Sequence, residues 1–277
     1  MKTVTMTTTR SPSPDYDLVN KRVLITGGGS GIGAALARAC GQRGAIVGIC
    51  GRRTDRLADV LSELHEHSTA SRAWTIDLAD LDGLEHFAAT VIDELDGIDV
   101  LINNAGIPKR RTVMALTYDE VEYVNRINYL SPIRLTLALL PNLIERHGQI
   151  VNISSVAARL SPPAEAAYAA TKAAVTAWSE SMVVDLGIAG IELGVHVVNP
   201  GVFDTELFHL PGNDVFTAPV EMLATSEIVE PVLNLLGTTQ FEAYVPAWFG
   251  DVVGHKFPDT TAYLQGNIAY GRAQNQS

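Results

Sequence analysis

The sequence predicts a doubly wound α/β fold, in which a parallel sheet has helices on both of its faces. Two observations predict it. Short apolar runs alternate with helical patterns from Lys21 onward, and the first run leads through a glycine-rich turn into the first helix. Strands that alternate with helices are joined in parallel by right-handed crossovers, which place helices on both faces. We expect a single domain over residues 21–277, because no linker or change of composition divides this region.

The first strand is the compact run RVLI at 22–25, and the helical run AALARACGQRG ends at Gly44, since glycine favours a helix end. The same criteria apply along the rest of the chain. Further strands are expected at 45–50, 73–76, 99–103, 149–153 and 192–198, and further helices at 54–67, 81–95, 118–126, 132–146 and 167–186.

The composition is that of an ordinary globular protein, with 277 residues, 47% of them hydrophobic and 18% charged. The net charge of -11 disfavours nucleic acid or an anionic membrane as a partner. No apolar run reaches the length of about 18 residues that a membrane span needs.

Cys40 and Cys50 lack the spacing of a metal site or a disulfide framework, so we expect reduced, packed thiols and a cytoplasmic protein. Residues 1–20, rich in Thr, Ser and Pro, are expected to form a mobile tail.

The glycine-rich turn TGGGSGIG lies between the first strand and the first helix. Gly27, Gly31 and Gly33 there permit a tight turn, a close approach of the backbone to a pyrophosphate, and close packing of helix on strand. The phosphates would rest against the helix N-terminus. A P-loop is excluded, because no Gly-Lys-Ser/Thr follows. The turn therefore predicts a dinucleotide site.

The order and spacing of several motifs resemble the short-chain dehydrogenase/reductase family, which has a Rossmann-type fold. The first loop matches the pattern TGxxxGxG of its shorter reductase/dehydrogenase branch, rather than the GxxGxxG typical of the extended branch. The other matching segments are NNAG at 103–106, Asn128, IVNISS ending at Ser155, YAATK from Tyr168 to Lys172, and NPG at 199–201 followed by Thr205. The resemblance spans about residues 21–205 and implies a hydride-transferring oxidoreductase.

Tyr168 and Lys172 lie four residues apart on a predicted helix, so both side chains project from one face. An ammonium beside a phenol stabilises the phenolate and lowers its pKa from about 10. Tyr168 could then give a proton to, or take one from, the oxygen of a carbonyl or alcohol. Ser155, at the end of a strand, is suited to hold that oxygen by a hydrogen bond.

The resemblance also assigns roles that the residues alone do not. It implies that Lys172 binds the nicotinamide ribose and that Asn128 anchors a water relay, although Asn128 could equally be a structural break in its helix. Alternate strand residues face opposite sides, so only one of Ser154 and Ser155 can point to the substrate, and the family's distance of 13 residues to the tyrosine selects Ser155. A serine hydrolase is disfavoured, since no GxSxG elbow surrounds either serine.

Cofactor preference depends on GICGRR at 48–53, the end of the second strand. A carboxylate there binds the ribose hydroxyls of NAD, whereas arginine accommodates the 2′-phosphate of NADP. By resemblance, Gly51 stands where NAD-dependent relatives have aspartate, and Arg52 and Arg53 follow. We therefore expect NADP(H) to be preferred over NAD(H). The alternative is that both arginines are a solvated start to the next helix.

Further cofactor contacts are implied by the resemblance alone. Asp77 would lie beside the adenine, although it could simply cap the next helix. Thr205 would lie near the nicotinamide carboxamide. The complete set of expected cofactor-binding residues is Gly27, Ser30, Gly31, Ile32, Gly33, Arg52, Arg53, Asp77, Leu78, Asn104, Ala105, Gly106, Tyr168, Lys172, Pro200, Gly201 and Thr205.

The substrate is the least constrained feature. Residues 203–225 resemble the family's variable substrate lid in position. This segment contains the apolar residues Phe203, Leu207, Phe208 and Leu210. They predict either an apolar pocket for a hydrophobic ketone or alcohol, or ordinary core. The basic run at 109–111 is expected to be a solvated loop, or else an anionic-substrate contact at the cleft rim. The C-terminal segment at 245–266 is expected to serve packing or subunit contact, which fits a homodimer or homotetramer.

A non-catalytic NADP(H)-binding regulatory protein of the same fold is the alternative function. Such a protein could dispense with Ser155, Tyr168 or Lys172, and all three are present here. The sequence therefore favours the enzyme. No metal site is expected, since His65 and His67 are two residues apart on a predicted helix and point away from each other.

Overall fold

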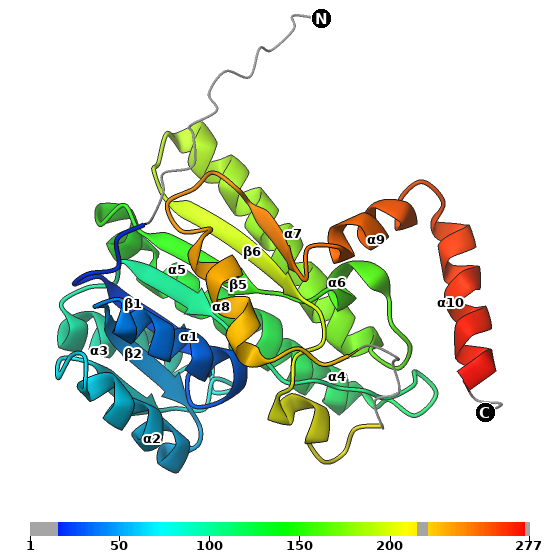
Figure 1. Cartoon of the computed structure of the whole chain (residues 1–277), viewed down its shortest axis with the longest axis horizontal. Helices are drawn as coiled ribbons and strands as arrows, with labels where there is room; N and C mark the ends of the chain where they lie inside the picture. Colours follow the sequence, from blue (N-terminus) through cyan, green and yellow to red (C-terminus); the bar gives the residue numbers. More distant parts are fainter. Residues whose placement is uncertain (1–15, 215–220, 275–277) are drawn as a thin grey trace, which may run out of the picture.

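The computed structural model describes residues 16–214 and 221–274, and there it contains a seven-stranded sheet with helices on both faces (Figure 1). All neighbouring strands are parallel. The strand order is β3-β2-β1-β4-β5-β6-β7. The strands are β1 (Arg22–Thr26), β2 (Ile46–Gly51), β3 (Arg72–Thr75), β4 (Val100–Asn103), β5 (Gln149–Ile153), β6 (Gly194–Pro200) and β7 (Glu242–Val245). The predicted doubly wound fold is confirmed.

The helices connect these strands in alternation through β6. They are α1 (Gly31–Gln42), α2 (Thr54–His65), α3 (Leu84–Leu95), α4 (Tyr118–Asn125), α5 (Ser131–Glu145), α6 (Ala157–Leu160), α7 (Ala166–Ala189), α8 (Val229–Leu233), α9 (Phe249–Lys256) and α10 (Thr260–Gln274). A π-helical turn, Arg126–Leu130, joins α4 to α5, and 3-10 turns occupy Glu206–His209 and Thr225–Ile228.

Two apolar clusters form the core, one on each face of the sheet. Helices α1, α2 and α8 bury their apolar sides against one face, where Val23 and Ile25 of β1 point. Helices α3, α5 and α7 pack on the other face, against Leu24 of β1 and Leu101 of β4. The alternation along β1 follows from the period of two in a strand, and burial on both faces requires its nearly continuous apolar sequence.

The strand order reverses beside β1, because β2 lies on one side of it and β4 on the other. In open parallel sheets, ligands bind in the crevice outside the carboxyl ends of the strands at such a reversal. Thr26, Asn103 and Ile153 end β1, β4 and β5 at this edge. The fold therefore brings the segments that follow β1, β4 and β5 together in one place.

Helices α6, α8, α9 and α10 were not predicted, and two further parts of the fold differ from the sequence prediction. Strand β7 was not predicted, because its four residues at the sheet edge are too short to show a period. The packed region also begins before the predicted boundary at Lys21. Leu18 is buried in the core, and the Asn20 amide donates to the Gly44 carbonyl, so residues 16–20 are not part of a tail. Residues 1–15 of the predicted tail lie outside the described residues.

Candidate active site

A cavity of about 520 Å³ lies at the carboxyl ends of the strands. It is lined by the segments that follow β1, β2, β4, β5 and β6 and by the first turns of α7. Every site residue predicted from the sequence lines it except Gly33 and Asn128, which support lining segments from behind. The chain therefore assembles the predicted cofactor and catalytic residues into one continuous cavity.

The loop after β1 is shaped by glycines in positions that other residues tolerate poorly. Gly27 and Gly31 have positive φ values of 68° and 53°. At Gly33 an added Cβ would lie 2.3 Å from the Gly27 carbonyl oxygen, so α1 can approach the loop this closely only with glycine. Ser30, the N-cap residue of α1, makes no side-chain cap hydrogen bond. The first amides of α1 thus lack a side-chain cap at the cavity, as a phosphate site requires.

Three arginines gather at the end of the cavity beside β2. Arg53 donates to the Ser30 hydroxyl at 2.8 Å, and Arg52 donates to the Tyr123 hydroxyl at 3.2 Å. Arg56, which sequence reasoning missed, lines the cavity one helical turn after Arg53. Its spacing of three residues from Arg53 on a helix would have placed it there. This end of the cavity fits an anionic group.

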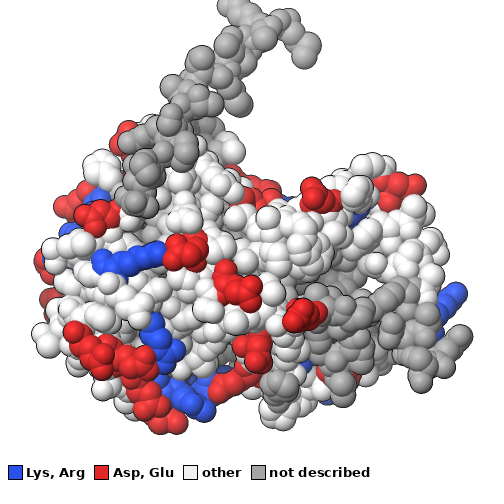
Figure 2. Space-filling model, in the orientation of Figure 1, with Lys and Arg blue, Asp and Glu red and all other residues white. Residues whose placement is uncertain are grey.

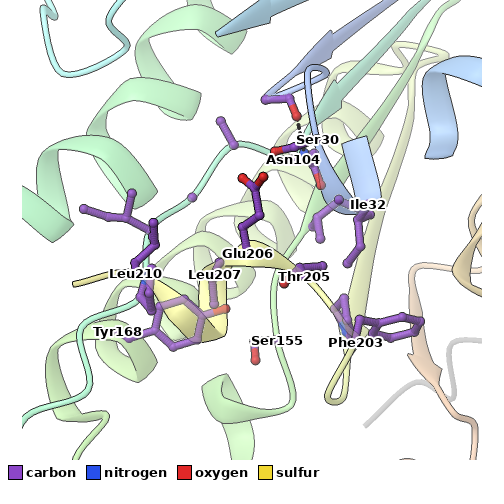
Figure 3. A pocket seen from close by; sticks show the side chains of 18 of the residues that line it. Ser30, Ile32, Asn104, Ser155, Tyr168, Phe203, Thr205, Glu206, Leu207 and Leu210 are labelled. Atoms are coloured by element: carbon purple, nitrogen blue, oxygen red, sulfur yellow. Dashed lines mark hydrogen bonds between the residues drawn. The ribbon is translucent and has the colours of Figure 1, made fainter. Parts of the chain in front are cut away.

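A carboxylate from the lid segment already contacts two of these arginines. Glu206 lies 2.6 Å from Arg53 and 3.5 Å from Arg56, and it projects into the cavity beside Ser30 in Figure 3. All three side chains are about half exposed, so solvent screens these pairs and each adds little stability. A phosphate that binds Arg53 would compete with Glu206.

The segment after β4 braces the glycine loop. The Asn104 amide nitrogen donates to the Thr26 carbonyl at 2.9 Å, and the Asn104 and Ala105 backbone amides both donate to the Thr26 hydroxyl. Asp77, after β3, accepts from the Ala79 amide at 2.9 Å in a local turn and does not cap α3, whose N-cap residue is Gly83. Asp77 nevertheless lines the cavity beside Leu78.

Tyr168, Lys172 and Ser155 meet at the other end of the cavity. The Tyr168 hydroxyl points toward Ser155 in Figure 3. The Lys172 ammonium donates to the Ile153 carbonyl at 2.8 Å and lies 5.8 Å from the centre of the Tyr168 ring. Ser155 accepts from the Ala157 amide at 3.1 Å, which leaves its own proton available for donation. The Ser154 hydroxyl, in contrast, is buried against α7 and donates to the Lys172 carbonyl at 3.1 Å.

Burial controls the protonation of this group. It raises the pKa of Tyr168 above its ordinary value, and the nearby Glu165 carboxylate adds to the rise, whereas Ser155 and Arg110 oppose it. Burial lowers the pKa of Lys172 to about 8. The expected lowering of the Tyr168 pKa by Lys172 is not found, because desolvation of the phenol dominates. Tyr168 is thus a protonated phenol at neutral pH, which suits proton donation to a forming alkoxide.

Asn128 lies in the π-helical turn between α4 and α5 and is buried. Its side chain accepts from the Ile107 amide at 2.8 Å and donates to the Ile107 carbonyl at 2.9 Å. It also donates to the Thr171 hydroxyl at 3.2 Å, one residue before Lys172. Asn128 therefore ties the loop after β4 to α7 beside Lys172, and the π turn places it there.

The rest of the cavity beside Tyr168 is largely apolar. The lid contributes Leu207, Phe208 and Leu210, and Phe203 both lines the cavity and belongs to the buried core. Residues 215–220 of the predicted lid lie outside the described residues. Phe249 of α9 also lines this part, so the C-terminal segment serves the cavity as well as packing. No local motif predicts Phe249, because it reaches the site from the opposite end of the chain.

The basic run at 109–111 is not the solvated loop that was expected. Arg110 is buried, and its guanidinium donates to the Phe208 carbonyl at 2.9 Å and to the Asp214 carbonyl at 3.3 Å. Lys109 and Arg111 both donate to the Gly212 carbonyl. These three side chains hold the described part of the lid against the loop after β4.

Known proteins resemble this chain in sequence and in fold. A family model described as short chain dehydrogenase matches residues 21–213. The chain is 37% identical over 205 residues to dehydrogenase/reductase SDR family member 7B of Rattus norvegicus, an alignment that covers 72% of this chain and 62% of the relative. It is 37% identical over 169 residues to an uncharacterized oxidoreductase of Mycobacterium bovis, covering 58% of this chain and 49% of that protein. The chain thus spans about half to three fifths of these relatives.

Solved structures resemble most of the chain. A short chain dehydrogenase from Burkholderia cenocepacia in complex with NADP superposes with a TM-score of 0.72 at 27% identity, covering 82% of this chain and 97% of the other. A short chain dehydrogenase/reductase from Burkholderia phymatum in complex with NAD superposes with a TM-score of 0.80 at 20% identity, covering 89% and 96%, a likeness of fold alone. From the family model, the relatives and the assembled site, this chain belongs to the short-chain dehydrogenase/reductase family of oxidoreductases.

Proposed function

We propose that the protein transfers a hydride between NADP(H) and a carbonyl compound or secondary alcohol, with Tyr168 as the general acid and base. The observation that supports this most is the meeting of Ser155, Tyr168 and Lys172 in the same cavity as the glycine loop after β1. When bound, the nicotinamide would supply or accept the hydride. Ser155 would hold the carbonyl oxygen by a hydrogen bond that strengthens as negative charge develops, and Tyr168 would give its proton to that oxygen.

The direct test combines cofactor binding with turnover. The intrinsic fluorescence of the protein is titrated with NADPH and with NADH, and NADPH oxidation is then followed with a panel of aliphatic, aromatic, steroid and sugar ketones. We expect tighter binding of NADPH and turnover of apolar ketones, since apolar side chains surround Tyr168. Cofactor binding without turnover of any carbonyl would favour the non-catalytic regulatory protein instead.

Cofactor preference gives a sharper prediction. Replacing Arg52 and Arg53 together with alanine should raise the Kd for NADPH by about 10- to 100-fold, because a charge-assisted contact to the 2′-phosphate is lost, while the Kd for NADH changes little. Gly51→Asp should shift the preference toward NADH, since a side chain there meets only Leu57 at 3.9 Å and has room. Fluorescence titration measures both constants. Arg134→Ala, on the exposed side of α5, is the matched control. Equal losses for NADPH and NADH would contradict a 2′-phosphate role.

The partners and location follow as further proposals. We propose a cytoplasmic homodimer or homotetramer, supported by the exposed apolar side chains of Leu137 on α5 and of Val184 and Ile188 on α7, which subunit contacts commonly cover. Nucleic acid is not proposed as a partner, and on the face drawn in Figure 2 basic side chains do not form a continuous patch. Within the described residues, no helix is long and apolar enough to cross a membrane.

A further inference from the structure

One ionisable side chain in the substrate end of the cavity has no part in the mechanism above. Glu165 lines the cavity as the N-cap residue of α7, three residues before Tyr168. It is only partly exposed, and the cavity that it lines also includes the apolar side chains of Leu160, Pro162 and Phe208. A carboxyl group in such surroundings loses hydration, which costs free energy unless a partner compensates.

The protein supplies little of that compensation. Glu165 makes no side-chain hydrogen bond to the amides of α7, so it does not cap the helix that it begins. Among residues 16–214 and 221–274, the carboxyl group finds no hydrogen-bond donor. Burial accordingly raises its pKa. Helix capping, the ordinary structural explanation for this residue, therefore does not account for it.

Arg110 supplies a positive charge that acts on Glu165. The positive guanidinium lowers the pKa of Glu165, and the two side chains act on the pKa of Tyr168 in opposite directions. The Arg110 guanidinium is also held by lid carbonyls at Phe208 and Asp214. Because Arg110 already supplies a positive charge that acts on Glu165, a neutral donor suits the unfilled acceptor better than a second cation.

We propose that Glu165 is a specificity-determining residue that accepts a hydrogen bond from a hydroxyl group of the substrate. This inference rests on the proposed function and narrows its substrate class to hydroxy ketones, or diols in the reverse direction, on an otherwise apolar skeleton. Residues three apart on a helix have Cβ atoms about 5–6 Å apart. A ketone held at Tyr168 can therefore present a hydroxyl group a few atoms away to Glu165.

The test uses ketones that differ in one group. NADPH oxidation by the wild-type protein is measured with octan-2-one, 1-hydroxyoctan-2-one, 4-hydroxyoctan-2-one and 1-aminooctan-2-one. We expect kcat/KM to be about 10- to 100-fold higher for one of the hydroxy ketones than for octan-2-one, the worth of a hydrogen bond to a charged acceptor. Glu165→Leu should collapse this ratio toward one, whereas Glu165→Gln, which keeps an acceptor oxygen, should retain part of it.

The ratio between two substrates separates recognition from the electrostatic effect of Glu165 on Tyr168, because that effect acts on every ketone alike. Glu66→Leu, which removes an equal charge from the exposed end of α2, should keep the wild-type ratio. A ratio that survives in Glu165→Leu would overturn the inference while leaving the proposed function intact. A preference for the amino ketone that Glu165→Gln abolishes would overturn the choice of a hydroxyl. Failure to oxidise NADPH with any ketone would overturn the proposed function itself.

Discussion

Replacing Tyr168 with phenylalanine should lower kcat for carbonyl reduction by about 10²- to 10⁴-fold, the usual contribution of a positioned general acid. Only the hydroxyl is removed, and the ring keeps its place against Lys172. The Kd for NADPH should therefore change by less than about threefold. Steady-state kinetics and fluorescence titration on the same preparation measure both effects.

Tyr118→Phe is the matched control for this substitution. Tyr118 is 78% exposed at the start of α4, so the loss of its hydroxyl should leave kcat unchanged. A Tyr168→Phe variant that reduces ketones at the wild-type rate would exclude the phenol as the proton donor. A variant that loses NADPH binding to the same extent as turnover would place Tyr168 in the binding of the cofactor instead.

The pH dependence of reduction gives an independent reading of the same site. Burial raises the pKa of Tyr168 above its ordinary value, so the phenol keeps the proton that reduction needs throughout the neutral and mildly alkaline range. Lys172, whose pKa burial lowers to about 8, loses its charge within that range. A change in kcat centred near pH 8 would thus report the deprotonation of Lys172. A wild-type profile that instead lost all activity near pH 6 would contradict both the protonated state of Tyr168 and the charge change of Lys172.

The sequence predicts the fold well where secondary structure is regular and the strands are interior. Strands β1, β4 and β5 are buried on both faces, so most of their positions are apolar, and such runs are visible without a structure. Strand β7 pairs only with β6 at the edge of the sheet and is half-buried, so its residues are not constrained in this way. Helices α9 and α10 follow the last interior strand, and their residues are likewise not constrained by burial on both sides, so they were not predicted.

The candidate site likewise contains residues whose place the sequence predicts and residues whose place it does not. Residues on the segments that leave interior strands, such as Ser155 and Asn104, are placed by the sheet itself, and their positions along the chain indicate where they lie. Glu206 and Phe249 come from the lid and from α9, so their approach depends on packing between segments distant in sequence. Glu165 is an intermediate case. Its spacing from Tyr168 puts it near the site, but only its lack of a capping bond shows that it does not serve the helix.

Replacing Gly33 with alanine should disrupt cofactor binding through the backbone, without removing any side chain that touches the ligand. The added methyl would lie 2.3 Å from the Gly27 carbonyl oxygen and 2.5 Å from the Asn104 amide nitrogen. Both groups belong to segments that line the cavity, so the loop must move away from α1. We expect the Kd for NADPH to rise at least about tenfold, since the first amides of α1 would no longer meet the pyrophosphate as closely.

Gly187→Ala separates this clash from the general benefit of alanine in a helix. Gly187 lies in α7, and an added methyl there meets nothing within 4 Å, so this variant should gain about 0.5–1 kcal/mol in the free energy of unfolding. The preference of a helix for alanine over glycine acts at Gly33 as well. The difference between the two variants in the free energy of unfolding, measured with urea, therefore reports the clash alone, which we expect to be about 1–3 kcal/mol for overpacking. The prediction would be contradicted if Gly33→Ala had the same free energy of unfolding as Gly187→Ala and kept the wild-type Kd for NADPH. The glycine loop would then not be held against α1 at Gly33, and their close contact would not form the phosphate site.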